Sequence, residues 1–193
     1  MRTIFPSLLL ASLLGAQDSS PRQELGLTLG RVLSDARLGL GTAMQVDYGY
    51  RVATMGSTAV FVDVHFLANP QRKVSVAEPT ATQDVAALFL TPGVRLKFLY
   101  TSRVSPYVTA GGGLSVLEHS RTVFSGQPNP APRTTKGGAF TYGAGVDVRI
   151  QRWLSLRGEV RDFYAGSPVL NLRNVPGRQN TVVVSGGLVL QFR

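Results

Sequence analysis

Residues 140–165 read FTYGAGVDVRIQRWLSLRGEVRDFYA, and their pattern gives the clearest indication of the fold. Apolar and polar side chains alternate through its first half, break at Gln151–Arg152, and alternate again through its second half. A period of two places the apolar side chains on one face of a β-strand and the polar ones on the other. Two alternating runs joined by a short break predict an antiparallel hairpin.

The same pattern recurs from Glu24 onward, with Gly, Pro, Asn and Ser at the breaks. It predicts eight strands, at about 24–33, 38–53, 58–68, 85–100, 105–118, 139–151, 153–165 and 180–192. After the N-terminus no apolar run reaches the 18 residues that a membrane-spanning helix needs. Strands of a barrel give a much weaker hydropathy signal. We therefore predict an all-β fold, an eight-stranded antiparallel up-and-down transmembrane β-barrel.

The connections alternate in length along the chain. Those after the second, fourth and sixth strands are short, and those after the third, fifth and seventh are long: 54–57, 101–104 and 151–152 against 69–84, 119–138 and 166–179. The first connection, near 34–37, is short and departs from this rule. Outer-membrane barrels have short turns on the periplasmic side and long loops outside. An even strand number then predicts both chain ends on the periplasmic side.

Each strand has one apolar and one charged face, and the sequence indicates which of them points outward. Glycines such as Gly93, Gly143 and Gly187 fall mainly on the charged face, where a narrow lumen needs small residues. Aromatic residues lie on the apolar face near the strand ends, as in interfacial girdles. We therefore expect the apolar face toward lipid and the charged face toward the barrel axis.

The inward charges are nearly balanced, and they form our candidate site. The predicted lumen charge network is Asp47, Asp63, Arg95, Lys97, Asp147, Arg149, Arg157, Glu159 and Arg161, with Glu24 and Arg51 on the same face. An eight-stranded interior is just wide enough for side chains to fill, and desolvated charges need partners. The favoured interpretation is a salt-bridge network that plugs the lumen. The alternative is a narrow, anion-favouring pore.

The first residues read as an export signal. Arg2 precedes an apolar run over residues 4–14, followed by the small residues Gly15 and Ala16, which is the layout of a secretory signal peptide. We predict a signal peptide over residues 1–16 and a single barrel domain over 17–193. The chain has no cysteine, which suits an oxidising compartment and excludes thiolate metal sites.

The net charge of +9 raises the question of nucleic acid as a partner, but the basic residues form no run, so none is expected. The surplus charge falls in the predicted outer loops, at Arg72, Lys73, Arg121, Arg133, Lys136, Arg173 and Arg178. Such side chains can bind lipopolysaccharide phosphates through charge-assisted hydrogen bonds. Simple solvated loops are the alternative interpretation.

Motifs for chemistry are weak. His65 and His119 are the only histidines and lack the spacing of a zinc site. Asp63 and His65 share a strand face, while Ser120 and Ser125 lie in a predicted loop. We predict no catalytic, metal or cofactor site, and we interpret His65 as a hydrogen-bonded lumen residue.

Four segments resemble a known family. SPYVTAGGGL (Ser105–Leu114), FTYGAGVDVRI (Phe140–Ile150), RWLSLRGEVRDFY (Arg152–Tyr164) and SGGLVLQF (Ser185–Phe192) resemble small outer-membrane β-barrels of the outer-membrane protein A and opacity types. The resemblance implies the barrel fold and a location in the cell outer membrane.

The last strand also resembles the assembly signal of that family. Ser185, Gly187, Leu190 and the aromatic Phe192 occupy the matching positions, with Arg193 following. The resemblance implies that the barrel-assembly machinery is a transient partner. For the function we expect a monomeric structural or surface-interaction barrel in outer-membrane lipid, with a narrow channel as the alternative. A soluble periplasmic barrel or an outer-membrane enzyme ranks behind both.

Overall fold

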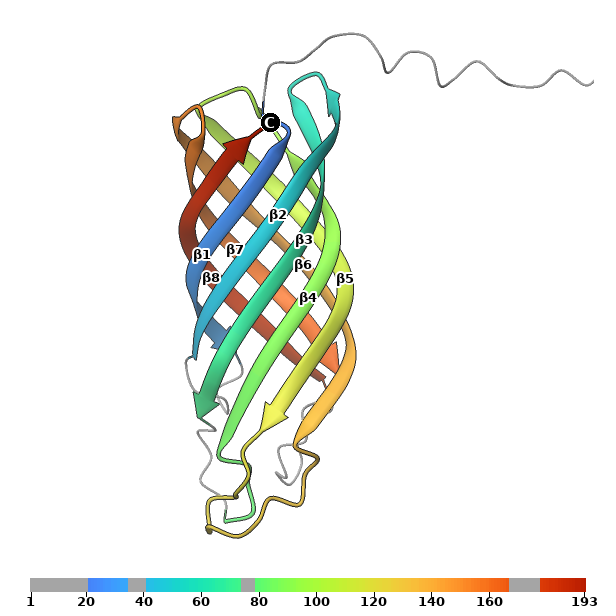
Figure 1. Ribbon diagram of the computed structural model, residues 1–193, viewed down its shortest axis with the longest axis vertical. Helices are drawn as coiled ribbons and strands as arrows, with labels where there is room; N and C mark the ends of the chain where they lie inside the picture. Colours follow the sequence, from blue (N-terminus) through green and yellow to red (C-terminus); the bar gives the residue numbers. More distant parts are fainter. Residues whose placement is uncertain (1–20, 35–40, 74–78, 167–177) are drawn as a thin grey trace, which may run out of the picture.

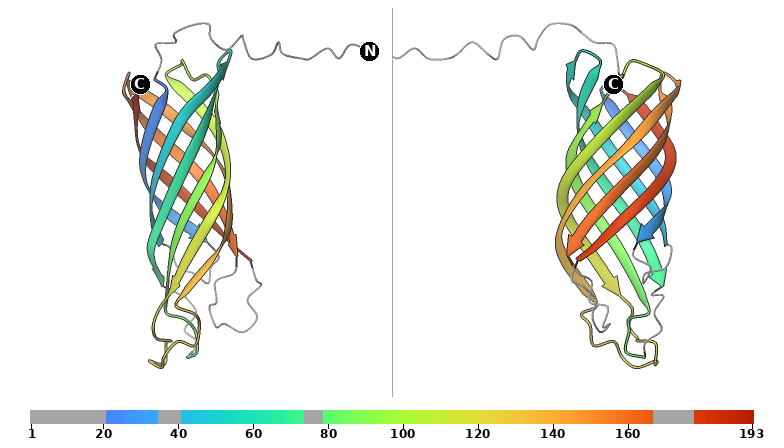
Figure 2. Two further views of the ribbon diagram at one scale, coloured as in Figure 1. Left: turned by 45° about the vertical axis from the view of Figure 1, so that its right-hand side comes forward. Right: turned by 180° about the vertical axis from the view of Figure 1, so that it is seen from behind.

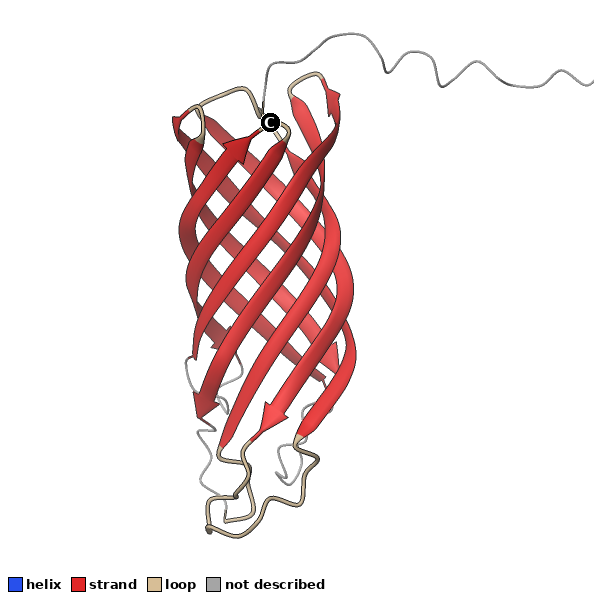
Figure 3. Cartoon of the chain, viewed as in Figure 1, coloured by secondary structure: helices blue, strands red, loops and turns tan. Residues whose placement is uncertain are grey.

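The computed structural model is a closed barrel of eight antiparallel strands joined in chain order (Figures 1 and 3). It describes residues 21–34, 41–73, 79–166 and 178–193. The strands are β1 (Gln23–Ser34), β2 (Gly41–Met55), β3 (Thr58–Lys73), β4 (Asp84–Lys97), β5 (Val104–His119), β6 (Thr134–Gln151), β7 (Leu154–Gly166) and β8 (Arg178–Phe192). Within the described residues, no helix has the length and apolar character needed to cross a membrane.

The predicted number of strands and their up-and-down order are confirmed, and the bounds differ mainly at one end. β3 continues to Lys73, and β6 begins at Thr134, five residues before the predicted start. The alternation fades at these polar ends, but the backbone ladder continues, for example between Glu118 and Thr134. Backbone pairing therefore extends beyond the apolar pattern, and the long loops are shorter than expected.

The short turns lie at one end of the barrel, and residues 79–83 and 120–133 lie at the other (Figure 2). The chain end after β8 lies beside the turns, as the loop rule predicts. At the other end the β4–β5 pairing continues past the rim: Ser120 N donates to Asp84 O at 3.0 Å, and Thr82 pairs with Val123. We call residues 79–83 and 120–133 the outer extension.

The register defines how the strands lean. A rung that starts at Gln23 and crosses all eight strands returns to β1 at Leu33, ten residues further along the strand. For eight strands, this shift corresponds to a tilt of about 40° from the barrel axis. Each step from β1 toward β2 therefore rises toward the outer extension, and each step from β1 toward β8 descends.

The two faces point as predicted. Leu156 and Leu190 are 47% and 36% exposed, whereas Arg157 and Glu159 on the other face are 3% and 4% exposed. Aromatic residues add to the outward surface, and Trp153 lies exposed at the β6–β7 turn. The outward surface is therefore apolar and suited to lipid, while the polar side chains fill the interior.

Candidate functional site: the layered lumen

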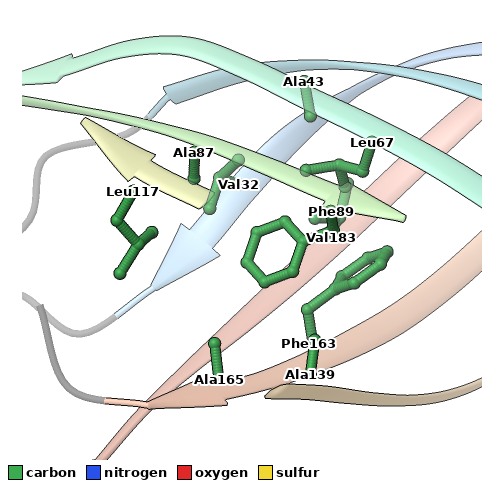
Figure 4. Packing of buried hydrophobic residues seen from close by; sticks show 10 residues of the cluster. All are labelled: Val32, Ala43, Leu67, Ala87, Phe89, Leu117, Ala139, Phe163, Ala165 and Val183. Carbon is green, nitrogen blue, oxygen red and sulfur yellow. The ribbon is translucent and has the colours of Figure 1, made fainter. Parts of the chain in front are cut away.

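The interior of the barrel consists of layers that follow one another along the axis. A charge layer near the turns holds six acidic and basic side chains: Glu24, Asp47, Arg95, Lys97, Asp147 and Arg157. Above it lies a polar layer that includes Gln45, His65, Thr91, Thr141, Glu159 and Arg161. Toward the outer extension lies an apolar layer (Figure 4), made of Val32, Ala43, Leu67, Ala87, Phe89, Leu117, Ala139, Phe163, Ala165 and Val183.

Arg157 of β7 is the centre of the charge layer. Its Nε and Nη2 donate to the two carboxylate oxygens of Asp147 at 2.8 Å each, and its Nη1 donates to Asp47 Oδ1 at 2.7 Å. Such two-pronged geometry is the strong form of the arginine–carboxylate pair. A Cβ at Gly26 would overlap the Asp47 carboxylate. Glycine at this position of β1 therefore makes room for the pair.

Lys97 and Arg95 of β4 complete the layer. Lys97 Nζ lies 2.5 Å from Glu24 Oε1 and 2.7 Å from Asp147 Oδ2, and Arg95 Nη1 lies 3.1 Å from Asp47 Oδ2. Three carboxylates thus face three cations, so the layer is neutral. Mutual pairing of this kind offsets much of the cost of removing the charges from water.

Tyr107 of β5 links the charge layer to a second ion pair. Its ring lies 4.9 Å from the Arg157 guanidinium carbon, and its hydroxyl donates to Glu159 Oε2 at 2.7 Å. Glu159 in turn accepts from Arg161 Nε at 3.0 Å and from Nη2 at 2.9 Å. Cation–π contact and hydrogen bonding therefore join the two groups across one aromatic side chain. The sequence reasoning missed Tyr107, although it has the inward parity of its strand.

The nine residues of the candidate network do not all meet. Five of them join Glu24 in the charge layer, and Glu159 pairs with Arg161 above it. Asp63 is buried, yet neither of its carboxylate oxygens has a hydrogen-bond partner among the described residues. Arg149 lies at the mouth beside the turns, where it donates to the carbonyl oxygens of Thr101 and Tyr100 at 2.9 and 2.5 Å.

The apolar layer was not foreseen from the sequence. The rings of Phe89 and Phe163 lie 5.1 Å apart at its centre, and His65 lies 5.7 Å from Phe163 below them. All ten members are at most 9% exposed. Their inward parity could have revealed them, because the charged side of each strand turns apolar near its outer end.

The mouth near the turns is open. A hollow of about 560 Å³ lies there, with Glu24, Tyr100, Arg149 and Trp153 among its lining residues. Because Glu24 belongs to the charge layer, this hollow reaches the plugged part of the lumen from the side of the turns.

The residues considered for catalysis do not form a triad-like arrangement. His65 Nε2 shares a 2.9 Å hydrogen bond with Gln45 Oε1, and Ser120 Oγ donates to Thr122 O at 2.8 Å. Ser125 is exposed in the outer extension, and His119 Nδ1 lies 3.0 Å from Pro132 O. His65 is thus a hydrogen-bonded residue of the lumen.

The predicted basic loop residues are only partly described. Arg121, Arg133 and Lys136 are exposed at the outer end, and Arg133 pairs with Glu118 at 3.1 Å. Arg72 and Lys73 fall within the end of β3, and Arg178 is the first residue of β8. Arg173 and the predicted signal peptide, residues 1–16, lie outside the described residues.

The comparisons with known proteins agree on one kind of fold. The profile of the family described as "Outer membrane protein beta-barrel domain" matches residues 3–188. The chain is similar to the crystal structure of Neisserial surface protein A (NspA), with 16% identity and a TM-score of 0.56, covering 88% of this chain and 96% of that one. No curated protein matches the chain.

Two further solved structures are similar at lower scores. OprG from Pseudomonas aeruginosa has 13% identity and a TM-score of 0.51, covering 90% of this chain and 97% of that one. Ail from Yersinia pestis, in complex with the heparin analogue sucrose octasulfate, has 14% identity and a TM-score of 0.50, covering 89% and 97%. Identities this low show a shared fold.

Proposed function

The chain belongs to the outer membrane protein β-barrel domain family, and on that basis we propose that it is a closed structural barrel that displays its outer extension. It resides in the cell outer membrane, as the family and the similar structures indicate. The proposal assigns no catalysis to the chain and no conduction to its lumen.

One observation carries this proposal: the lumen combines a neutral salt-bridge layer with an apolar layer. An ion would have to displace Arg157 from Asp47 and Asp147, which leaves buried charges without partners. It would then have to cross a region packed by Phe89 and Phe163, which offers no replacement for its hydration shell. Either layer obstructs ions, and together they favour a plug over a pore.

Recordings of the full chain in planar lipid bilayers test this proposal. We expect no stable conductance steps from the folded protein. A double variant, Phe89→Ala with Arg157→Ala, removes bulk from both layers and should produce small steps if it folds. A matched outward variant, Val94→Ala, should remain silent. Stable steps from the unmodified protein would favour the narrow channel instead.

The exposed cations of the outer end supply the proposed contact with lipopolysaccharide. Arg121 and Lys136 are exposed there, whereas Arg133 is already paired with Glu118. Phosphate groups would accept charge-assisted hydrogen bonds from these two side chains. The Ail complex with a heparin analogue offers a parallel in which a similar barrel binds a polyanion. An Arg121→Ala, Lys136→Ala variant should copurify with less lipopolysaccharide than Arg152→Ala, changed at the opposite end.

The last strand supplies the proposed assembly signal. Leu190 and Phe192 point outward from β8, while Ser185 and Gly187 point inward. The barrel-assembly machinery would therefore read an aromatic and an aliphatic side chain on one face. Phe192→Ala should lower the amount of folded barrel in the outer membrane, after export by the proposed signal peptide over residues 1–16.

A further inference from the structure

Two charged side chains interrupt the apolar outward surface on one wall of the barrel. Arg31 of β1 and Asp162 of β7 both point outward, on either side of β8. At comparable depth the other strands present apolar side chains outward: Met44, Phe66, Leu90, Leu114 and Phe140. We call the outward side chains of β7, β8 and β1 the β8 wall.

The register places Arg31 and Asp162 at the same depth. The rung through Arg31 passes Val184 of β8 and reaches Val160 of β7. With strands about 4.8 Å apart and tilted about 40°, these two steps descend by about 6 Å. The two residues from Val160 to Asp162 rise again by about 5 Å. Figure 1 shows the lean of the strands from which these steps follow.

The two charges are held differently. Tyr142 Oη and Asn180 Nδ2 donate to Asp162 Oδ2 at 2.9 and 3.2 Å, so neighbours on β6 and β8 position this carboxylate. Arg31 is exposed and has no ion pair with another described residue. A charge that faces lipid within the apolar band is unfavourable. A partner of opposite sign at the same depth would remove this disadvantage.

Below the charges the wall contains a shallow notch. Gly158 of β7 and Gly186 of β8 are register partners, and both point outward. A Cβ at Gly158 would come no closer than 4.0 Å to another side chain, and one at Gly186 would lie 3.6 Å from Arg157 O. The barrel itself therefore has room for a side chain at both positions. Small residues on a membrane-facing surface let another backbone approach closely.

We propose that the β8 wall is the contact surface for a second copy of this chain. In a two-fold dimer about an axis along the membrane normal, β8 faces β8, and β1 of each copy faces β7 of the other. The depths then match in sequence: Leu27 faces Gly158 of the second copy, and Arg31 faces Asp162 of the second copy. A bulky residue meets the notch, and each cation meets an anion, twice by symmetry.

The proposal goes beyond the structural role above and differs from the monomer expected from the sequence. It commits to a second copy because the wall carries both signs of charge in self-complementary positions. A lipopolysaccharide phosphate would use Arg31 and leave Asp162 facing an anion.

Cysteine cross-linking in native outer membranes tests the proposal, because the chain has no cysteine of its own. Gly186→Cys places a thiol near the two-fold axis, and a short bis-maleimide should join two copies. Val94→Cys is the matched control, since it points outward at similar depth from β4 on the opposite side. We expect at least fivefold more dimer from Gly186→Cys. Equal yields from the two positions would contradict a specific contact.

Charge exchange then identifies the contact. In the Gly186→Cys background, Arg31→Glu or Asp162→Arg should each lower the dimer yield at least fivefold, and both together should restore it. The heat-dependent gel shift shows that each variant is folded, and Arg31→Gln replaces Arg31→Glu if the latter is not. An unchanged yield in the single variants would overturn the proposal and favour pairing across β8 within one barrel. If no dimer forms and the Arg31 variants copurify with less lipopolysaccharide, the β8 wall would instead be a binding surface for lipid.

Discussion

Arg157 is hydrogen-bonded to two carboxylates, one distant in the chain and one close to it. It holds Asp47, 110 positions away, and Asp147 on the neighbouring strand. All three side chains are at most 3% exposed. Removing the guanidinium would leave two buried carboxylates with fewer partners, which is far more costly than losing an exposed pair.

We therefore expect Arg157→Met to lower the free energy of unfolding by about 3–5 kcal/mol. The measurement is urea unfolding of the barrel in lipid vesicles, followed by tryptophan fluorescence. Arg152→Met, at the exposed β6–β7 turn, should change the midpoint very little. Equal effects of the two substitutions would show that the charge layer adds no specific stability.

Gly187 of β8 and its neighbour Gly186 differ in the space available for a side chain. A Cβ at Gly187 would overlap Leu27 O of β1 and come within 2.6 Å of Thr28 Cα, whereas one at Gly186 has room. Gly187→Ala should therefore cost about 1–3 kcal/mol through strand displacement, and Gly186→Ala should be close to neutral. The heat-dependent gel shift and the urea midpoint compare the two. A tolerated Gly187→Ala would mean that β1 and β8 can separate freely.

At the scale of the strand, Pro92 interrupts the ladder between β4 and β5. The register pairs Leu90 with Leu114 and Gly93 with Gly111, and omits the pairs between them. Asp84 and Phe98 bond to β5, so the even-numbered residues of β4 face that strand. Proline has no backbone N–H to donate there.

Pro92→Ala should stabilise the barrel by about 1 kcal/mol, because it supplies a hydrogen bond in a region without water. Pro106→Ala is the control, since Pro106 lies beside the β4–β5 turn, where water can reach the backbone. Urea midpoints and hydrogen exchange near Gly112 check the outcome. An unchanged urea midpoint for Pro92→Ala would show that the β4–β5 backbone has already adjusted to the missing hydrogen bond.

At the scale of the whole molecule, the two ends of the barrel face different compartments. The outer extension should lie outside the cell, and the short turns should face the periplasm. Ser125 and Ser57 are exposed at these opposite ends. In intact cells, a membrane-impermeant maleimide should label Ser125→Cys and leave Ser57→Cys unmodified until the outer membrane is opened. Reversed labelling would invert the orientation.

Several features of the fold follow from sequence patterns within single strands. A period of two, the positions of the breaks and the parity of the glycines predicted eight strands, their order and the face that meets lipid, and the structure confirms all three. The alternation is visible because each backbone step turns the side chain to the other face. After Ala68 in β3, polar residues end the alternating pattern, so the sequence no longer predicts a strand. The backbone hydrogen bonds nevertheless continue to Lys73.

The strands, their apolar outward faces and the set of inward charges could be predicted from the amino-acid sequence, because side-chain parity is a local property of each strand. Which of these charges meet depends on the three-dimensional arrangement of the strands. Register and tilt bring Glu24 and Asp47 within ion-pair distance of Arg157 and set Arg31 level with Asp162, while Asp63 forms no hydrogen bond with a described residue. The depth of a residue along the barrel axis is fixed by the register of all eight strands in the closed ladder. It therefore cannot be predicted from any single segment of sequence.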